Sequence, residues 1–339
     1  MHLLRGKKRG KVGSLLLALA LTGVLAYWIL YAANALPARA SIPVAGQRPV
    51  TDSVGWTYGT YLVALGETFI GTPYVGGTLE VEGEEQLVVN LEEVDCTTFV
   101  EYVLALAAAG MQPEELPHLR TSFRAEREVG KERADEYRAA AVFEGFVDAQ
   151  RRALFMQELE QYRYRGGRCM GYLSRLHYFT EWLLDNEQRG RLKILRNLPG
   201  SVPLPLSLNF MSTHSHLYPR LAGQAILVDS LRVLEQRLTN ITLSYLPNSE
   251  IAAAEVHLEE GDVIAFVTEV EGLDVSHTGL AMFRDDRLYL LHASTRRNVV
   301  ERSPQVLSEY IKGMPGVVGI MVARATVPKK AQSCIVQPK

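Results

Sequence analysis

The hydrophobic pattern changes in the last third of the chain, and this change constrains the fold more than any other feature of the sequence. Short runs rich in β-branched and apolar residues follow one another there, with turn residues between them. Because short runs separated by turns pair with their neighbours, we expect an antiparallel sheet. The runs span residues 262–268, 277–283, 288–293 and 317–324.

Helical patterns precede this sheet, and the combination predicts an α+β fold. Apolar residues recur at helical spacing over residues 58–70, and a strongly apolar helix over 97–109 ends at Gly110. Further helices are expected over residues 132–162 and 173–186.

The length of the chain predicts its domain organisation. At about 150 residues per domain, 339 residues suggest two units or one domain with a large insertion. We expect one domain over residues 56–325 that carries a mostly helical insertion over 112–257. A linker at 41–55 precedes the domain, and a tail at 326–339 follows it.

The start of the chain carries a membrane-targeting signal. Basic residues from Arg5 to Lys11 precede an uncharged run of 22 residues, 12–33, in which Leu and Ala dominate. The run reaches the ~20 residues that span a bilayer, and small-residue sites that resemble signal-peptidase sites follow it. We therefore expect residues 1–40 to be either a signal peptide or an N-terminal membrane anchor. The body of the protein would then be exported, to the periplasm or to the outer side of a membrane.

The charge balance argues against a nucleic-acid partner. Residues 1–40 hold six Lys or Arg and no Asp or Glu. The remaining residues therefore hold 30 basic against 38 acidic side chains, a net charge of −8. An acidic body without a basic stripe does not suit a phosphate backbone.

Cys96 is the cysteine in the most suggestive setting, because it stands directly before the apolar helix over 97–109. At a helix N-terminus, backbone N–H groups and the helix dipole favour the thiolate, and the same groups can hold an oxyanion. The structural alternative is a small buried side chain, so a nucleophile would need a base. Cys169 and Cys334 either pair as a disulfide or remain free.

Two histidines supply a candidate base and its partner through strand register. Residues 284–287 form the turn between the second and third runs, and either a two-residue or a four-residue loop gives the same pairing. This pairing sets Gly279 opposite His292, and His277 shares the face of Gly279. The two histidines then become diagonal neighbours, roughly 7 to 8 Å apart at Cα and within reach of a hydrogen bond.

An ordered set of motifs resembles the NlpC-type, papain-like cysteine peptidases and, in detail, the bacterial N-acetylmuramoyl-L-alanine amidase-like family. The resemblance covers most of residues 60–323, and the segment over 112–257 is longer than in the simpler superfamily members. The motifs are GTPYVGGT (71–78), VDCTTFVEYV (94–103), SRLHYFTEWLLDN (174–186), FMSTHSHLYPRL (210–221), EGDVIAFVT (260–268), VSHTGLAMF (275–283) and LYLLHAS (288–294).

This resemblance implies roles for individual residues. Cys96 would be the nucleophile, His277 the general base and His292 the third, polar member of the triad. Tyr74 would place a hydroxyl near the oxyanion, with Thr97 beside it. The core would be papain-like, with the Cys96 helix packed on the antiparallel sheet.

A second group of polar residues is expected to contact substrate. Ser212, Thr213, His214, His216 and Tyr218 form a polar cluster whose alternative reading is a surface loop that satisfies its own backbone. Arg175 and His177 lie two positions apart on a predicted helix, so only one of them should face the cleft.

The resemblance implies an exported cysteine amidase that cuts the N-acetylmuramoyl-L-alanine amide of peptidoglycan fragments, with a preference for anhydro-muropeptides. Neither a cofactor nor a metal is expected. Partners would be muropeptides and, if the N-terminal segment is retained, the membrane. Four alternatives remain: a γ-D-glutamyl-diamino acid endopeptidase, an acyltransferase, a non-catalytic wall-binding module, and a zinc amidase built around His214 and His216.

Overall fold

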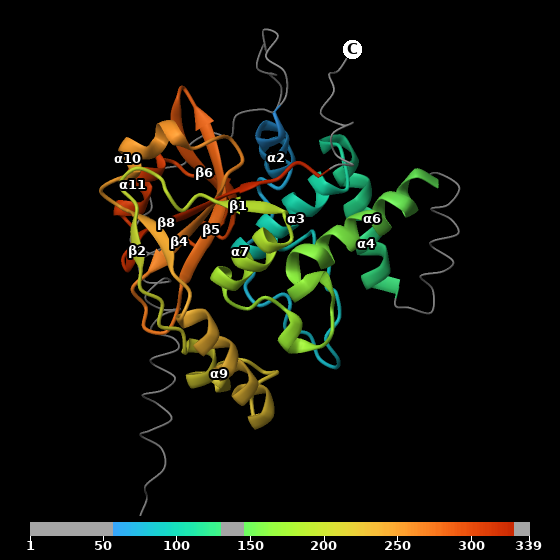
Figure 1. The fold of residues 1–339 in the computed structure, drawn as a ribbon. Helices are drawn as coiled ribbons and strands as arrows, with labels where there is room; N and C mark the ends of the chain where they lie inside the picture. Colours follow the sequence, from blue (N-terminus) through green and yellow to red (C-terminus); the bar gives the residue numbers. More distant parts are fainter. Residues whose placement is uncertain (1–56, 130–145, 329–339) are drawn as a thin grey trace, which may run out of the picture.

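The computed structural model describes residues 57–129 and 146–328, which form a mixed helix and sheet fold (Figure 1). The α+β class expected from the sequence is therefore confirmed. Within the described residues no helix is long and apolar enough to cross a membrane. The predicted signal peptide or anchor, the linker and most of the predicted tail lie outside the described residues.

The strands form one eight-stranded sheet in the order β2-β3-β8-β4-β5-β6-β7, with β1 also paired to β8. Among the described residues, all pairings between these strands are antiparallel. The strands are β1 (Leu192–Ile194), β2 (Val202–Leu204), β3 (Leu243–Pro247), β4 (Val263–Thr268), β5 (Val275–Arg284), β6 (Arg287–Ser294), β7 (Val299–Arg302) and β8 (Val317–Ala325).

The sequence prediction of the sheet is correct for β4, β5, β6 and β8 but incomplete. It missed β7, and it assigned no strand to residues 112–257, where β1, β2 and β3 lie. The strands in that segment are only three to five residues long, too short for an alternating pattern to stand out. Because β1 and β3 pair with β8, the segment that we expected as an insertion contributes to the sheet itself.

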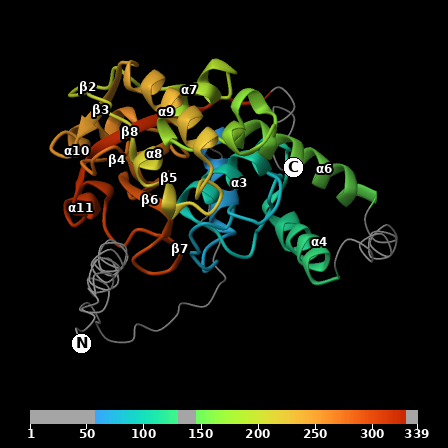
Figure 2. The ribbon, with the colours of Figure 1, turned by 90° about the horizontal axis from the view of Figure 1, so that it is seen from below.

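Helices cover both faces of the sheet, and side-chain alternation along the strands divides the core in two. On β5, Leu280 and Met282 pack into the larger core with α2, α3, α6 and α7, while Ala281 packs into the smaller core with α10 and α11. Figures 1 and 2 show α4 and α6 extending away from the sheet. The helices are α2 (Tyr58–Glu67), α3 (Cys96–Ala108), α4 (Leu116–Val129), α6 (Phe146–Arg163), α7 (Phe179–Gln188), α8 (Phe210–Thr213), α9 (Ala225–Thr239), α10 (Ile251–Ala254) and α11 (Leu307–Lys312).

Helix α3 is mostly apolar and buried in the larger core, which fixes the position of its first residue. Eleven of its 13 residues are buried, and it packs between α2, α6 and the strands β5 and β6. A helix surrounded by packing partners on every side has little freedom to shift along its axis. Its N-terminus is therefore a rigid platform for Cys96.

Candidate active site

Cys96 is the first residue of α3, and the residues around it form a capping box. The Asp95 carboxylate accepts a hydrogen bond from the Thr98 backbone N–H at 2.7 Å, and the Thr98 hydroxyl accepts one from the Asp95 backbone N–H at 2.8 Å. These reciprocal bonds satisfy two of the N–H groups that the helix leaves without partners. The thiol thus stands at the first residue of a helix that a capping box stabilises.

The environment of the thiol favours its neutral form. Hydrogen bonds from the Thr278 backbone and from the Thr97 hydroxyl and backbone lower the pKa of Cys96. Burial and the neighbouring Asp95 carboxylate outweigh them and raise that pKa to about 12. From the helix N-terminus alone we expected a lowered pKa for Cys96. Desolvation of the thiol instead raises this pKa, so the expectation was wrong.

The bond from Thr278 also joins two elements of the site. Thr278 follows His277 on β5, so this backbone contact ties the start of α3 to the strand that carries the candidate base. The role of Thr278 could not be predicted from the sequence, because a backbone donor has no residue-type signal.

The two histidines meet as the register argument predicted. Strands β5 and β6 pair Arg284 with Arg287 and Leu280 with Leu291, the expected register. His277 Nε2 lies 2.6 Å from His292 Nδ1, and the two rings cross at 88°. The predicted hydrogen bond between the imidazoles is therefore confirmed.

Both imidazoles are buried and neutral near pH 7. Burial lowers the pKa of His277 to about 4. Burial lowers the pKa of His292 well below its ordinary value, with His277 and Arg296 adding to the effect. The His277 ring also packs against Phe266, and the His292 ring against Tyr310, both at 5.4 Å between centroids.

Tyr74 lies close enough to Cys96 for the thiol to affect the ionisation of the phenol. Burial raises the pKa of its phenol far above the ordinary value, and Cys96 and Asp95 raise it further. The phenol therefore keeps its proton and can donate a hydrogen bond. Backbone contacts hold Tyr74 in place, since its N–H donates to Asn298 O at 2.9 Å and it forms an isolated bridge with Val94.

The polar cluster predicted over 212–218 forms two short helical turns, α8 and a 3-10 turn over Ser215–Leu217. Ser212 is buried, and its N–H donates to the Glu235 carboxylate of α9 at 3.0 Å. Thr213 is exposed and donates to Asn209 O, while the half-buried His214 ring stacks on Phe210 at 4.4 Å.

The side chains of Thr213 and His214 therefore interact mainly with nearby residues of the same segment. Tyr218 instead lies near carboxylates from other parts of the chain. Burial and the carboxylates of Glu80 and Glu235 raise the pKa of Tyr218 to about 12. Within the parts of the chain that the structure describes, no group of three or more His, Cys, Asp or Glu could hold a metal ion, so His214 and His216 are not joined by further ligands there.

Arg175 and His177 do not lie on a helix, so the predicted helix over 173–186 is wrong in its first part. A 3-10 turn covers Tyr172–Ser174, and α7 begins at Phe179. Two contacts set these limits: Arg175 forms an isolated bridge with Tyr164, and the Asp274 carboxylate accepts the Thr180 N–H at 2.6 Å. Neither contact has a signal in the sequence, because the partners are 11 and 94 positions apart and no motif or periodicity connects them.

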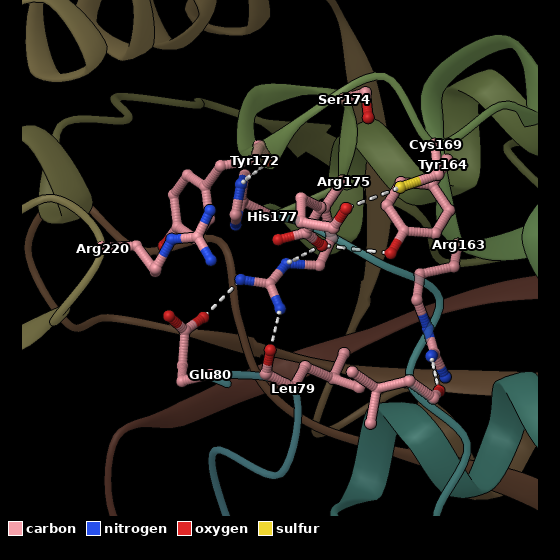
Figure 3. A network of polar contacts seen from close by, with 12 residues as sticks. Leu79, Glu80, Arg163, Tyr164, Cys169, Tyr172, Ser174, Arg175, His177 and Arg220 are labelled. Atoms are coloured by element: carbon pink, nitrogen blue, oxygen red, sulfur yellow. Dashed lines mark hydrogen bonds and ion pairs between the residues drawn. The ribbon is translucent and has the colours of Figure 1, made fainter. Parts of the chain in front are cut away.

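The structure gives both side chains protein partners. Arg175 is buried and bonded to residues 79, 80 and 85 (Figure 3). His177 is half-buried, with Nε2 2.9 Å from Tyr172 O and its ring 4.5 Å from the Tyr172 ring. Burial and the Arg175 charge lower the pKa of His177 to about 3.

Cys169 is a free, half-buried thiol that donates to Glu85 O at 3.7 Å. Cys334, its possible disulfide partner from the sequence, lies outside the described residues.

A family model and a solved structure indicate the same family. Residues 64–125 and 141–318 match the model of the N-acetylmuramoyl-L-alanine amidase-like family. The structure is similar to that of an N-acetylmuramoyl-L-alanine amidase from Bacteroides uniformis, with 32% sequence identity and a TM-score of 0.64 over 79% of this chain and 99% of that chain. No curated protein matches the chain.

Two further solved structures have the same fold. A protein from Bacteroides fragilis, described as a proposed xylanase, shares 33% identity at a TM-score of 0.62, over 77% of this chain and 99% of that chain. A protein from Legionella pneumophila shares 20% identity at a TM-score of 0.54, over 79% of this chain and 89% of that chain. At that identity the second likeness concerns the fold alone.

Proposed function

The chain belongs to the N-acetylmuramoyl-L-alanine amidase-like family, and from this premise we propose that it is a cysteine-dependent amidase of peptidoglycan fragments. The family suggests a hydrolase that acts on amide bonds, with a peptidoglycan-related substrate and an extracytoplasmic location. The nucleophile, the bond that is cut and the route of export are our proposal.

One observation carries the mechanism: the hydrogen bond of 2.6 Å between His277 Nε2 and His292 Nδ1. This bond orients the His277 ring and leaves Nδ1 as its remaining nitrogen. A base oriented by a third group, on the strand whose Thr278 backbone bonds to the Cys96 thiol, is the arrangement that nucleophilic catalysis needs. Hydrolysis of a glycosidic bond would instead use a pair of carboxylates.

The pKa directions indicate how the reaction starts. With the thiol pKa raised and the His277 pKa lowered, the resting pair is a neutral thiol and a neutral imidazole. Cys96 Sγ attacks the lactyl carbonyl of N-acetylmuramic acid as its proton passes to His277 Nδ1. His292 supports the imidazolium that forms, and Tyr74 donates to the oxyanion.

The second half of the reaction releases both products. His277 gives its proton to the L-alanine nitrogen as the C–N bond breaks, which leaves a muramoyl thioester on Cys96. Water, deprotonated by the same imidazole, then attacks the thioester and frees the sugar acid and the thiol.

We propose soluble anhydro-muropeptides as the preferred substrate. The family resemblance points to them, and the helices and loops of residues 112–257 would wall off the cleft so that fragments fit better than intact strands. We also propose a papain-like, NlpC-type core and an exported protein, held at the membrane if the N-terminal segment is retained.

Mass analysis of the products tests the proposal. The purified protein is incubated with an anhydro-muropeptide, with the Cys96→Ser variant as the control. We expect free anhydro sugar together with an intact stem peptide. A sugar that still carries L-Ala-D-Glu would indicate the endopeptidase. An anhydro-muramoyl group transferred to an added amine, with the stem peptide released, would indicate the acyltransferase. No cleavage of any muropeptide would favour a wall-binding module.

A further inference from the structure

Residues 79–88, here called the 79–88 loop, hold their shape through side chains from a distant part of the chain. The loop contains no helix or strand, and its one backbone-to-backbone hydrogen bond among the described residues runs from Glu80 N to Gly77 O. Five of its carbonyls accept from side chains instead. The bonds are Arg175 to Leu79 at 2.9 Å, Arg220 to Val81 at 3.3 Å, Cys169 to Glu85 at 3.7 Å, Tyr164 to Gln86 at 3.0 Å and Arg163 to Val88 at 2.5 Å.

Arg175 makes the most contacts with the 79–88 loop. One terminal nitrogen donates to Leu79 O, the other donates to the Glu80 carboxylate, and Nε lies 3.7 Å from the Glu85 carboxylate. The guanidinium also lies over the Tyr172 ring at 4.9 Å (Figure 3). Arg175 is only 5% exposed, so these contacts form away from solvent. One residue therefore fixes three points of a loop that has little structure of its own.

The 79–88 loop is part of a longer segment, residues 75–94, that starts and ends beside Cys96. The chain leaves the site after Tyr74 and returns at Val94, where Val75 N donates to Val94 O at 2.9 Å and Val94 N donates to Pro73 O at 3.0 Å. Asp95 and Cys96 follow directly. These backbone bonds close the segment beside Cys96, so a displacement of the loop changes the border of the site and leaves the thiol in place.

A second arginine links the same loop to the nucleophile helix. Arg163 bonds Val88 O and also donates to Glu101 of α3 at 2.7 Å, and the side chains of this ion pair are 1% and 3% exposed. The isolated bridge between Tyr164 and Arg175 holds the two arginine-bearing segments together. Residues 163–175 thus connect α3 and the loop as one unit.

We propose that Arg175 is a positioning residue that holds the 79–88 loop as a wall of the substrate cleft, and that it acts on muropeptide binding rather than on the chemistry at Cys96. The proposal rests on the proposed amidase function. It assigns Arg175 an indirect role in place of the substrate contact expected from the sequence. Helix α3 and strands β5 and β6 are held by the core without Arg175, whereas the loop depends on it.

The test compares Arg175→Ala and Arg175→Lys with a matched control, Arg191→Ala. Arg191 is a comparable arginine that avoids the loop: it bonds Glu158 at 2.6 Å, lies over the Tyr162 ring at 4.5 Å, and its side chain is 15% exposed. Three quantities are measured: KM and kcat for an anhydro-muropeptide, the rate at which iodoacetamide alkylates Cys96, and cleavage by a Glu-specific protease at the exposed Glu82 and Glu84.

For Arg175→Ala we expect KM to rise about tenfold while kcat stays within about threefold. Alkylation of Cys96 should keep the wild-type rate, and the protease should cut the loop faster. Arg175→Lys should recover part of the loss, because an ammonium reaches one acceptor but lacks the planar fork. Arg191→Ala should lower the melting temperature without changing KM or loop cleavage.

An unchanged KM with unchanged loop cleavage would overturn the proposal, as would the same rise in KM for Arg191→Ala. If Arg175→Ala does not fold, the same three quantities are compared between Arg175→Lys and Arg191→Ala. The protease measurement does not depend on muropeptide turnover. It therefore tests the role of Arg175 separately from the proposed amidase function. A wild-type protein that cleaves no muropeptide defeats the proposed function, while unchanged loop cleavage in a folded Arg175 variant defeats the role of Arg175.

Discussion

Gly279 faces His292 across the β5 and β6 pairing so closely that no side chain fits between them. A Cβ built on Gly279 would lie 2.8 Å from His292 Cβ and 2.8 Å from Leu291 O. The absence of a side chain at position 279 is thus a condition for the imidazole pair, because the His292 ring reaches His277 from this position.

Gly279→Ala should therefore damage both stability and activity. We expect a loss of about 1 to 3 kcal/mol in the free energy of unfolding, as overpacking in a core usually costs. The kcat should also fall, because His292 must move away from His277 to make room for the added methyl group. Denaturant unfolding and kcat together check this, with Gly313→Ala as control, since its Cβ would meet Tyr310 O at an ordinary 3.6 Å. A fully stable and active Gly279→Ala would contradict the argument.

Cys96→Ser should abolish nearly all turnover while the protein keeps its fold, since only one atom changes. We expect a loss of about 10³-fold or more in kcat, as for other nucleophile substitutions. Cys169→Ser is the matched control, because Cys169 is also free and half-buried. Iodoacetamide should inactivate the wild type and Cys169→Ser alike, and EDTA should leave both active. Inactivation by EDTA would support the zinc amidase instead.

His277→Ala should be as severe as the loss of Cys96, because it removes the base. His292→Asn should be milder, with kcat reduced about tenfold, because an amide oxygen can still accept a hydrogen bond from His277 Nε2. Steady-state kinetics of the two variants, with circular dichroism to check folding, decides the point. Equal losses in both variants would be inconsistent with the roles assigned to base and orienting partner.

Tyr74→Phe should reduce kcat about 10²-fold if the phenol stabilises the oxyanion. The substitution keeps the ring, and the backbone bridge to Val94 does not involve the hydroxyl. The melting temperature should therefore stay close to that of the wild type. A variant with wild-type kcat would mean that Tyr74 serves only to pack the loop.

The buried imidazole of His277 should make stability depend on pH. Its folded-state pKa of about 4 is below the ordinary 6.5, so the unfolded chain binds more protons between these values. This contribution to stability is complete above pH 6.5 and is lost as the pH falls to 4, by about 3 kcal/mol.

Comparison with His277→Gln isolates this contribution from that of other groups. Glu181 and Glu260 act in the opposite direction, because burial raises the pKa of each to about 7. Denaturant unfolding at pH 7.5 and pH 4 should give a smaller loss on acidification for His277→Gln than for the wild type. The same loss in both proteins would show that His277 does not titrate as described.

The features that the sequence predicted well are local ones. The turn at Asp285 and Asp286 fixes the register of β5 and β6, and both residues have the positive φ angles, 50° and 58°, that a tight hairpin turn requires. The position of His292 relative to His277 followed from this turn alone. Likewise, Gly110 and the apolar run before it were sufficient to locate α3.

The features that escaped prediction depend on contacts between distant residues. Arg163 and Glu101 are 62 positions apart, and Arg175 and Leu79 are 96 apart, so no periodicity or motif connects them. The direction in which the pKa of Cys96 shifts could not be predicted from the sequence either. The helix N-terminus can be recognised from residue types, but the degree of burial that outweighs it can be read only from the fold.

The position of β8 in the sheet has a consequence for biosynthesis. This strand, Val317–Ala325, pairs with β1, β3 and β4, all of which precede it in the chain. During synthesis these three strands cannot complete their pairing until β8 has been made. One of them, β4, also pairs with β5, which forms a hairpin with β6 and carries His277. Pairings over such sequence separations form slowly. The nascent chain therefore completes the sheet that carries His277 and His292 only after almost the whole domain has emerged.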